Sequence, residues 1–209
     1  MAQTRSKHSQ VNIAILSRAP IPGQTKTRLI PALGAEGAAE LHCRFLHATV
    51  RTALQAGLGP VTLWCTPDTS HPEFAACAAL GPLTLCPQAS GDLGQRMLAT
   101  INGPTLIIGT DCPALTPAHL QQAAAALNQH DAVLIPAEDG GYVLIGLRQA
   151  EPAVFADMTW GSATVFEQTR QRLRDLGYSW RELPGLWDVD EAADLTRLAI
   201  THPEMLKPT

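Results

Sequence analysis

Residues 11–29 read Val11-Asn12-Ile13-Ala14-Ile15-Leu16-Ser17-Arg18-Ala19-Pro20-Ile21-Pro22-Gly23-Gln24-Thr25-Lys26-Thr27-Arg28-Leu29. The run 11–16 is short and mostly apolar, which is typical of a strand buried on both faces of a parallel sheet. A loop rich in proline and glycine follows and ends with the cations Lys26 and Arg28. In open α/β sheets the ligand crevice lies beyond the carboxyl ends of the strands, so this loop is the first candidate site.

Similar apolar runs recur along the chain, separated by longer stretches with helical periodicity. The expected strands are 11–16, 61–65, 83–86, 105–108 and 132–135, and the expected helices are 35–56, a segment that starts after the N-cap Asp92, 119–127, 163–176 and 191–200. This alternation predicts an α/β, three-layer sandwich with a mostly parallel, Rossmann-like sheet. A strand at 142–147 follows its predecessor too closely for a helical crossover, so we expect it to be antiparallel.

One domain is expected, because 209 residues exceed the usual domain size only slightly. It would span residues 11–200, with a last strand near 178–183, a flexible tail at 1–10 and a C-terminal tail at 201–209. Apolar residues make up 45% of the chain and charged residues 16%, a composition that excludes a disordered segment.

The net charge of −4 argues against a general binder of nucleic acid or of anionic membranes. The five cysteines form no C-x-x-C pair, which argues against a disulfide framework or a structural zinc site. The seven histidines show no metal-ligand spacing and are interpreted as solvated. Neither a secretory leader nor a membrane span is evident, so a cytoplasmic protein is expected.

The loop after the first strand carries the only lysine outside the two tails. The other lysines are Lys7 and Lys207, and elsewhere the folded body uses arginine. A P-loop is excluded because Thr25 and Pro20 stand where that motif needs glycine. We therefore expect the loop backbone, Lys26 and Arg28 to hold a polyphosphate, although a solvated surface loop is the alternative.

Carboxylates follow two other predicted elements. Asp111 follows the apolar strand 105–108 and suits a hard divalent cation, although it could instead cap a turn. Asp188 and Asp190 lie on the same side of an extended segment, and either could be the N-cap of the last helix.

Three weaker motifs remain open between structural and functional roles. The turn 139–142 contains two glycines that would suit either a hairpin or the close approach of a ligand. Ser162, after Trp160, is either an N-cap or a contact for a phosphate on an acceptor. Arg96 is either a substrate clamp or solvated. No Ser-His-Asp or Cys-His arrangement is suggested.

Six motifs occur in order over nearly the whole chain: P-x-P-G-x-x-K-T-R-L, G-D-L-G-x-R-M, G-T-D-C-P, D-G-G-Y-x-L-I-G, W-x-S and D-V-D-x-x-x-D. Together they resemble the bacterial family named radical-SAM/selenodomain-associated transferase 1, a branch of the GT-A, nucleotide-diphospho-sugar transferase fold. The cationic loop is similar to that of 2-phospholactate guanylyltransferase and, more distantly, of molybdenum cofactor guanylyltransferase and sugar nucleotidyltransferases. The sugar nucleotidyltransferase start L-x-G-G-x-G-x-R is missing here, so the resemblance does not identify the base.

The resemblance implies a set of site residues. Lys26, Arg28 and Asp111 would be catalytic, and Mg²⁺ or Mn²⁺ would bind Asp111 and Asp190 rather than Asp188. The expected nucleotide-binding residues are Ser17, Ala19, Pro22, Gly23, Lys26, Arg28, Asp92 and Arg96. The expected acceptor residues are Asp139, Gly140, Gly141, Tyr142, Trp160 and Ser162.

The leading functional hypothesis is a Mg²⁺-dependent nucleotidyltransferase that transfers a nucleoside monophosphate from a nucleoside triphosphate to a small phosphorylated or hydroxylated acceptor. The alternatives are a glycosyltransferase that uses a nucleotide sugar and a nucleotide-binding module without catalysis. A glycosyltransferase would be favoured by a D-x-D motif after the central strand, where this chain has Thr110 and a single aspartate. The expected partners are thus small molecules, with a homodimer compatible with the sequence.

Overall fold

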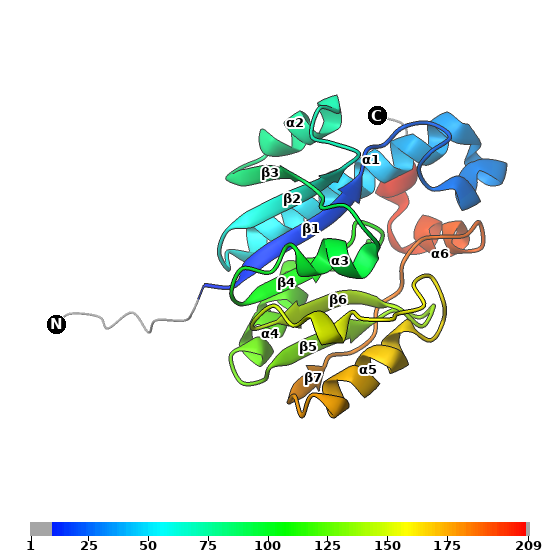
Figure 1. Cartoon of the computed structure of the whole chain (residues 1–209). Helices are drawn as coiled ribbons and strands as arrows, with labels where there is room; N and C mark the ends of the chain where they lie inside the picture. The colour runs from blue at the N-terminus through cyan, green and yellow to red at the C-terminus, as the bar shows by residue number, and fades with distance from the viewer. Residues whose placement is uncertain (1–9, 208–209) are drawn as a thin grey trace.

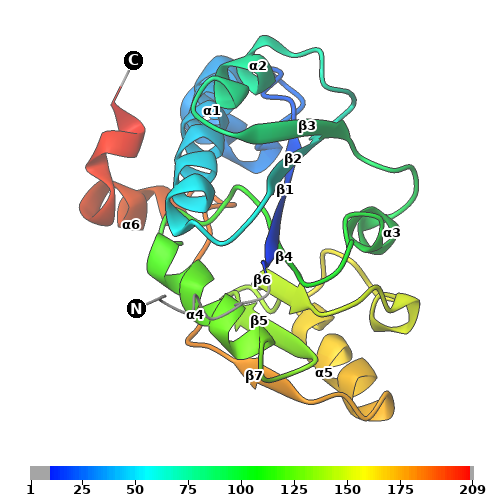
Figure 2. The same ribbon diagram turned by 90° about the vertical axis from the view of Figure 1, so that its left-hand side faces the viewer.

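A computed structural model describes residues 10–207, in which a seven-stranded sheet lies between two helical layers (Figure 1; Figure 2). The predicted three-layer α/β architecture with a mostly parallel sheet is therefore confirmed. The flexible tail expected at 1–10 lies, apart from Gln10, outside the described residues.

The strand order is β3-β2-β1-β4-β6-β5-β7. The bounds are β1 (Asn12–Arg18), β2 (Val61–Thr66), β3 (Leu83–Pro87), β4 (Thr105–Ile108), β5 (Ala132–Pro136), β6 (Tyr142–Leu147) and β7 (Trp180–Glu182). All neighbouring pairs are parallel except those of β6, which is antiparallel to both β4 and β5. The antiparallel strand predicted at 142–147 is thus confirmed, bounds included.

Helices cover both faces of the sheet (Figure 2). One face carries α1 (Ile30–Ala56), α2 (Pro72–Ala78), α4 (Pro117–Leu127) and α6 (Asp194–Thr201), and the other carries α3 (Leu93–Leu98) and α5 (Val165–Asp175). Short 3-10 turns complete the fold: η1 (Thr27–Leu29), η2 (Pro152–Val154) and η3 (Pro203–Leu206). The helix α2 was not predicted.

The alternation of side chains along β1 explains why residues 13–16, in the middle of the strand, are all apolar. Ile13 and Ile15 are fully buried in the cluster beneath α1, whereas Ala14 is buried in the cluster on the opposite face. A strand covered on both faces has no exposed position that would favour a polar residue.

One predicted helix start agrees with the structure and one does not. Asp92 accepts from the backbone of Gln95, whose side chain bonds back in a capping box, so the predicted N-cap of α3 is confirmed. The N-cap of α5 is Thr164 rather than Ser162, because the Ser162 hydroxyl instead donates to Thr159 O.

Neither Asp188 nor Asp190 caps α6, whose N-cap is Ala193. The Asp194 side chain, in the first turn, accepts from the backbone N–H groups of Asp190 and Glu191. Since Asp194 satisfies these donors, the carboxylates of Asp188 and Asp190 are not used as caps.

The C-terminal segment packs further than expected. Met205 and Leu206 of η3 lie against the cluster formed by α1 and α6, and Arg44 Nε donates to Met205 O at 2.6 Å. Met205 and Leu206, which were expected in a tail, are thus packed against the domain. Among the helices of residues 10–207, none combines the length and the hydrophobicity needed to span a bilayer.

Candidate functional site

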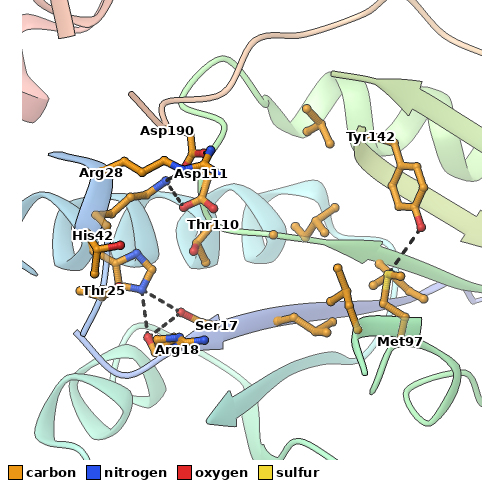
Figure 3. Close-up of a pocket in the computed structure, with 18 of the residues that line it drawn as sticks. Ser17, Arg18, Thr25, Arg28, His42, Met97, Thr110, Asp111, Tyr142 and Asp190 are labelled. Carbon is orange, nitrogen blue, oxygen red and sulfur yellow. Dashed lines mark hydrogen bonds and ion pairs between the residues drawn. The ribbon is translucent and has the colours of Figure 1, made fainter. Parts of the chain in front are cut away.

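A cavity of about 550 Å³ opens at the carboxyl ends of β1 and β4, where the sequence predicted a site (Figure 3). Its wall combines the loop after β1, the end of β4 and one residue of the C-terminal segment with residues of α1, α3 and β6. The lining residues are Leu16, Ser17, Arg18, Gln24, Thr25, Lys26, Thr27, Arg28, His42, Leu93, Met97, Ile107, Ile108, Gly109, Thr110, Asp111, Tyr142, Val143 and Asp190.

Lys26 lies at the junction of these three segments. Its side chain is only 5% exposed, and its Nζ is 2.8 Å from Asp111 Oδ1 and 4.0 Å from Asp190 Oδ1. The ammonium also donates to Val189 O at 2.5 Å. The backbone of Lys26 is left-handed, with φ of 47°, a conformation uncommon for a residue with a side chain. The loop is therefore shaped so that this lysine turns inward.

The C-terminal segment reaches the site through a backbone hydrogen bond. Val189 N donates to Asp111 O at 2.9 Å, so the chain before α6 runs beside the end of β4. This bond places Asp190 at the cavity, far though it is from Asp111 in sequence. Both carboxylates thus come within ion-pair distance of Lys26 Nζ.

Arg28 lies at the mouth of the cavity (Figure 3). Its Nη1 is 2.5 Å from Asp190 Oδ2 and 3.9 Å from Glu191 Oε1, and its side chain remains 63% exposed. An exposed ion pair contributes little to stability, so this arginine is free to bind an incoming anion without much loss.

The charges inside the cavity shift two pKa values. Burial alone would raise the pKa of Asp111, but the ammonium of Lys26 and the neighbouring His42 outweigh it and lower the pKa. Burial lowers the pKa of His42, against the opposing effect of Asp111. At neutral pH the site therefore holds an ionised Asp111 and a neutral His42.

His42 corrects the interpretation of the histidines as solvated. It is 4% exposed, lies on α1 and lines the cavity, with Nε2 2.9 Å from Arg18 O and 3.4 Å from Ser17 Oγ. Its Nδ1 is buried without a hydrogen-bond partner in the described structure. The histidine fixes the end of β1 from beneath.

The carboxylates suit a hard divalent cation. Asp111 Oδ1 is buried and has no hydrogen bond of good geometry beyond its ion pair with Lys26, while the side chain as a whole is half-exposed to the cavity. The donors are oxygens, which Mg²⁺ and Mn²⁺ prefer. Residues 10–207 contain no group of three or more His, Cys, Asp or Glu ligands. The remaining ligands would therefore be water and substrate phosphates, as is usual for Mg²⁺.

A second cavity of about 270 Å³ adjoins the first and shares Leu93, Gly109, Asp111, Tyr142 and Val143 with it. Its other lining residues are Cys112, Ala137, Asp139, Gly141, Trp160, Gly161, Ser162, Val165 and Asp188. Burial and the neighbouring Asp139 raise the pKa of Asp188 to about 6. Five of the six expected acceptor residues line this cavity, the exception being Gly140.

The two glycines of the turn after β5 have different roles. Gly140 has φ of +89°, and a Cβ there would lie 2.2 Å from Ala163 O, so chain packing requires this glycine. Gly141 has an ordinary φ, and a Cβ would meet only the Asp139 side chain at 3.1 Å. Gly141 lies at the cavity surface, whereas Gly140 lies beneath it.

Five residues expected to bind nucleotide do not line either cavity. Asp92 caps α3, and Arg96 Nε donates to Gly91 O. Ala19 is buried in the core, while Pro22 and Gly23 belong to the turn that leads to Lys26. The structure does not bring these side chains to the cavities, so their proposed direct role does not follow from it.

The lining residues missing from the expected site include Arg18, His42, Thr110 and Asp188. Arg18 and Thr110 could have been predicted from the sequence. Arg18 ends β1 and Thr110 follows β4, and both strands end at the crevice. Asp188 is close to Asp190 in sequence, but the family resemblance implied only Asp190. His42 carried no signal, since its position in the middle of a helix does not reveal which neighbour it faces.

A model of the bacterial family described as "Uncharacterized protein conserved in bacteria (DUF2064)" matches residues 49–162. None of the curated proteins matches the sequence significantly. The family match covers α3, β4 with Asp111 and the turn before β6, and it leaves out the cationic loop and the C-terminal segment.

Solved structures share the fold over most of their length. A protein from Desulfovibrio desulfuricans G20, proposed to be a nucleotide-diphospho-sugar transferase, is 30% identical, with a TM-score of 0.81 over 93% of this chain and 89% of its own. A nucleotidyl transferase from Methanothermobacter thermautotrophicus is 16% identical, with a TM-score of 0.60 over 95% and 99%. Rv0371c from Mycobacterium tuberculosis H37Rv, in complex with manganese, is 18% identical, with a TM-score of 0.57 over 92% and 100%. The expected GT-A-like fold is thus confirmed, whereas the narrower family resemblance stays a prediction.

Proposed function

The chain belongs to the DUF2064 family, and within it we propose that this protein is a metal-dependent nucleotidyltransferase. It would transfer a nucleoside monophosphate from a nucleoside triphosphate to a small acceptor. The fold it shares with a solved nucleotidyl transferase is compatible with this reaction but does not by itself establish it.

One observation carries the proposal: Lys26 Nζ lies within 4.0 Å of both Asp111 and Asp190, inside a cavity that Arg18 and Arg28 also line. Cations surrounding two carboxylates form a site that can hold a polyphosphate together with a divalent cation. A carboxylate pair without cations would repel the nucleotide, and cations without the carboxylates would not recruit the metal.

The reaction is an in-line displacement at the α-phosphorus. An acceptor oxygen forms the new bond to phosphorus, the bond to the β-phosphate oxygen breaks, and pyrophosphate leaves with the electron pair. Lys26 would turn from Asp111 toward the β- and γ-phosphates, and Arg28 would stabilise the charge that grows on pyrophosphate from the mouth of the cavity. A Mg²⁺ or Mn²⁺ ion on Asp111 and Asp190 would supply charge neutralisation at the triphosphate.

The volumes of the two cavities are compatible with one substrate in each cavity. About 550 Å³ is in the range of small-molecule sites and would take the nucleotide, while the adjoining cavity of about 270 Å³ would take a small acceptor. The shared wall at Asp111 is where the α-phosphate and the acceptor oxygen would meet.

Calorimetric titration with Mg²⁺ and each nucleoside triphosphate, followed by an assay for pyrophosphate, tests the proposal. Binding of a triphosphate with slow release of pyrophosphate, accelerated by the acceptor, is expected. Binding without turnover in any acceptor mixture would favour a non-catalytic nucleotide-binding module, and no binding of any triphosphate would contradict the proposal.

A second candidate is a glycosyltransferase that uses a nucleotide sugar. It is favoured by the Desulfovibrio protein, which is 30% identical and is itself proposed to be a nucleotide-diphospho-sugar transferase. The single aspartate after β4, preceded by Thr110, gives less support to it than a D-x-D motif would. Binding of sugar nucleotides in place of triphosphates in the same titration would establish this alternative.

A further inference from the structure

The two adjoining cavities differ in charge. Arg18, Lys26 and Arg28 line the larger cavity, together with Asp111 and Asp190. The smaller cavity is lined by Asp111, Asp139 and Asp188, and its described lining residues include no lysine, arginine or histidine. The cations of the site thus all lie on the side where the triphosphate would bind.

Resting on the proposed function, we infer that the acceptor is an alcohol that carries no phosphate or carboxylate group, and that an ammonium group on it strengthens its binding. This excludes the phosphorylated acceptors that the leading functional hypothesis left open. The inference concerns the smaller cavity alone, so it can be tested without the nucleotide.

The charged groups of the smaller cavity are all carboxylates, which accept hydrogen bonds. Asp139 Oδ1 accepts from Gly141 N at 2.8 Å, which orients the carboxylate and leaves its other oxygen for a ligand. Hydroxyl and ammonium groups donate hydrogen bonds to carboxylates. An ionised phosphate group mainly accepts hydrogen bonds, and the negative charge of a carboxylate repels it. A phosphate here would meet three carboxylates and no described cation of the smaller cavity, and like charges repel.

A divalent cation in the larger cavity does not remove this repulsion. A nucleoside triphosphate brings more negative charge than one divalent cation neutralises, so Lys26 and Arg28 are needed for the nucleotide itself. The remaining walls of the smaller cavity, among them Val143, Trp160 and Val165, are apolar and suit the carbon skeleton of an alcohol.

With an alcohol as acceptor, the bonds formed and broken in the reaction are the same as those proposed above. Its oxygen forms the bond to the α-phosphorus, the bond from phosphorus to the β-phosphate oxygen breaks, and pyrophosphate leaves with the electron pair. The hydroxyl proton, which a phosphate acceptor would not have to lose, passes to solvent.

Nuclear magnetic resonance titrations of the full chain test the inference with ethanolamine, glycerol and inorganic phosphate as separate probes. Ethanolamine is expected to shift the backbone amide signals of Gly141, Ser162 and Val165, with an apparent affinity at least tenfold higher than that of glycerol. Phosphate is expected to shift the signals of residues 24–28 and to leave those three unchanged. Asp139→Asn should weaken the ethanolamine response at least threefold, while Asp175→Asn, at the exposed end of α5, should not.

Shifts of Gly141, Ser162 and Val165 with phosphate would overturn the inference, and so would the absence of any response to ethanolamine. The proposed function fails separately, if Mg²⁺ with each nucleoside triphosphate leaves the signals of residues 24–28 unmoved. A final experiment compares the rates of pyrophosphate release with two pairs of acceptors. Glycerol is compared with glycerol 3-phosphate, and ethanolamine with O-phosphoethanolamine. Faster release with either phosphorylated member would also overturn the inference.

Discussion

Lys26 Nζ lies 2.8 Å from Asp111 Oδ1, which joins the loop after β1 to the end of β4. The lysine is almost fully buried while the aspartate is half-exposed. The pair therefore shields the positive charge from solvent and leaves one carboxylate oxygen open to the cavity. This arrangement explains both the low pKa of Asp111 and the inward turn of the loop.

A double-mutant cycle tests the ion pair. Asp111→Asn leaves the buried ammonium with only Val189 O and the more distant Asp190, so we expect a loss of about 1–3 kcal/mol in the free energy of unfolding. With Lys26→Met as the second change, the coupling energy should be about 1–2 kcal/mol. Urea denaturation without divalent metal measures it, and additive effects of the two changes would show that the pair does not stabilise the fold.

His42 predicts a pH dependence of stability. Burial lowers its pKa in the folded state, so as pH falls the unfolded chain takes up a proton on this histidine before the folded chain does. Stability should therefore be lost as pH decreases below the ordinary histidine value of about 6.5. His42→Gln should reduce that loss by about 1 kcal/mol between about pH 7.5 and about pH 5.

Denaturation of the parent and of His42→Gln across this range checks the prediction, with His130→Gln, between α4 and β5, as the control. Identical pH profiles for the parent and His42→Gln would mean that His42 is not held in its neutral form by the fold.

The glycine pair after β5 predicts a contrast in stability. Gly140→Ala forces a Cβ against Ala163 O at a positive φ, so it should cost more than about 2 kcal/mol. Gly141→Ala only displaces the Asp139 side chain and should cost less than about 1 kcal/mol. Thermal or urea denaturation compares the two, and equal losses would contradict the distinct roles of these glycines.

Much of the fold could be predicted because buried parallel strands carry a strong local signal. The expected strand 105–108 agrees with β4 in both bounds, and the spacing of 142–147 from its predecessor identified the antiparallel strand. The helix α2 was missed because it is short and its N-cap is His71, an uncommon capping residue. Local sequence therefore defined the strands better than the short helices.

The site could be predicted only where it follows strand ends. The loop 19–29 follows β1 and Asp111 lies shortly after β4, so the position of the crevice in α/β sheets located them. The approach of Asp190 depends on the hydrogen bond from Val189 N to Asp111 O, a contact between distant segments that the residues alone do not reveal. That the His42 side chain points toward the cavity likewise depends on how α1 packs against the sheet.

The measurement that tests nucleotidyl transfer most directly is the rate of pyrophosphate release by Lys26→Ala in the presence of Mg²⁺, a nucleoside triphosphate and acceptor. Removing a cation that stabilises the leaving pyrophosphate should cost on the order of 3 kcal/mol, or about a hundredfold in rate. Lys26→Arg should restore the rate only in part, because a planar guanidinium does not replace a compact ammonium. Lys207→Ala, at the exposed C-terminal end, should keep the parental rate. Pyrophosphate release by Lys26→Ala at the parental rate, or a parent that releases nucleoside diphosphate from a sugar nucleotide and no pyrophosphate from any triphosphate, would contradict the account.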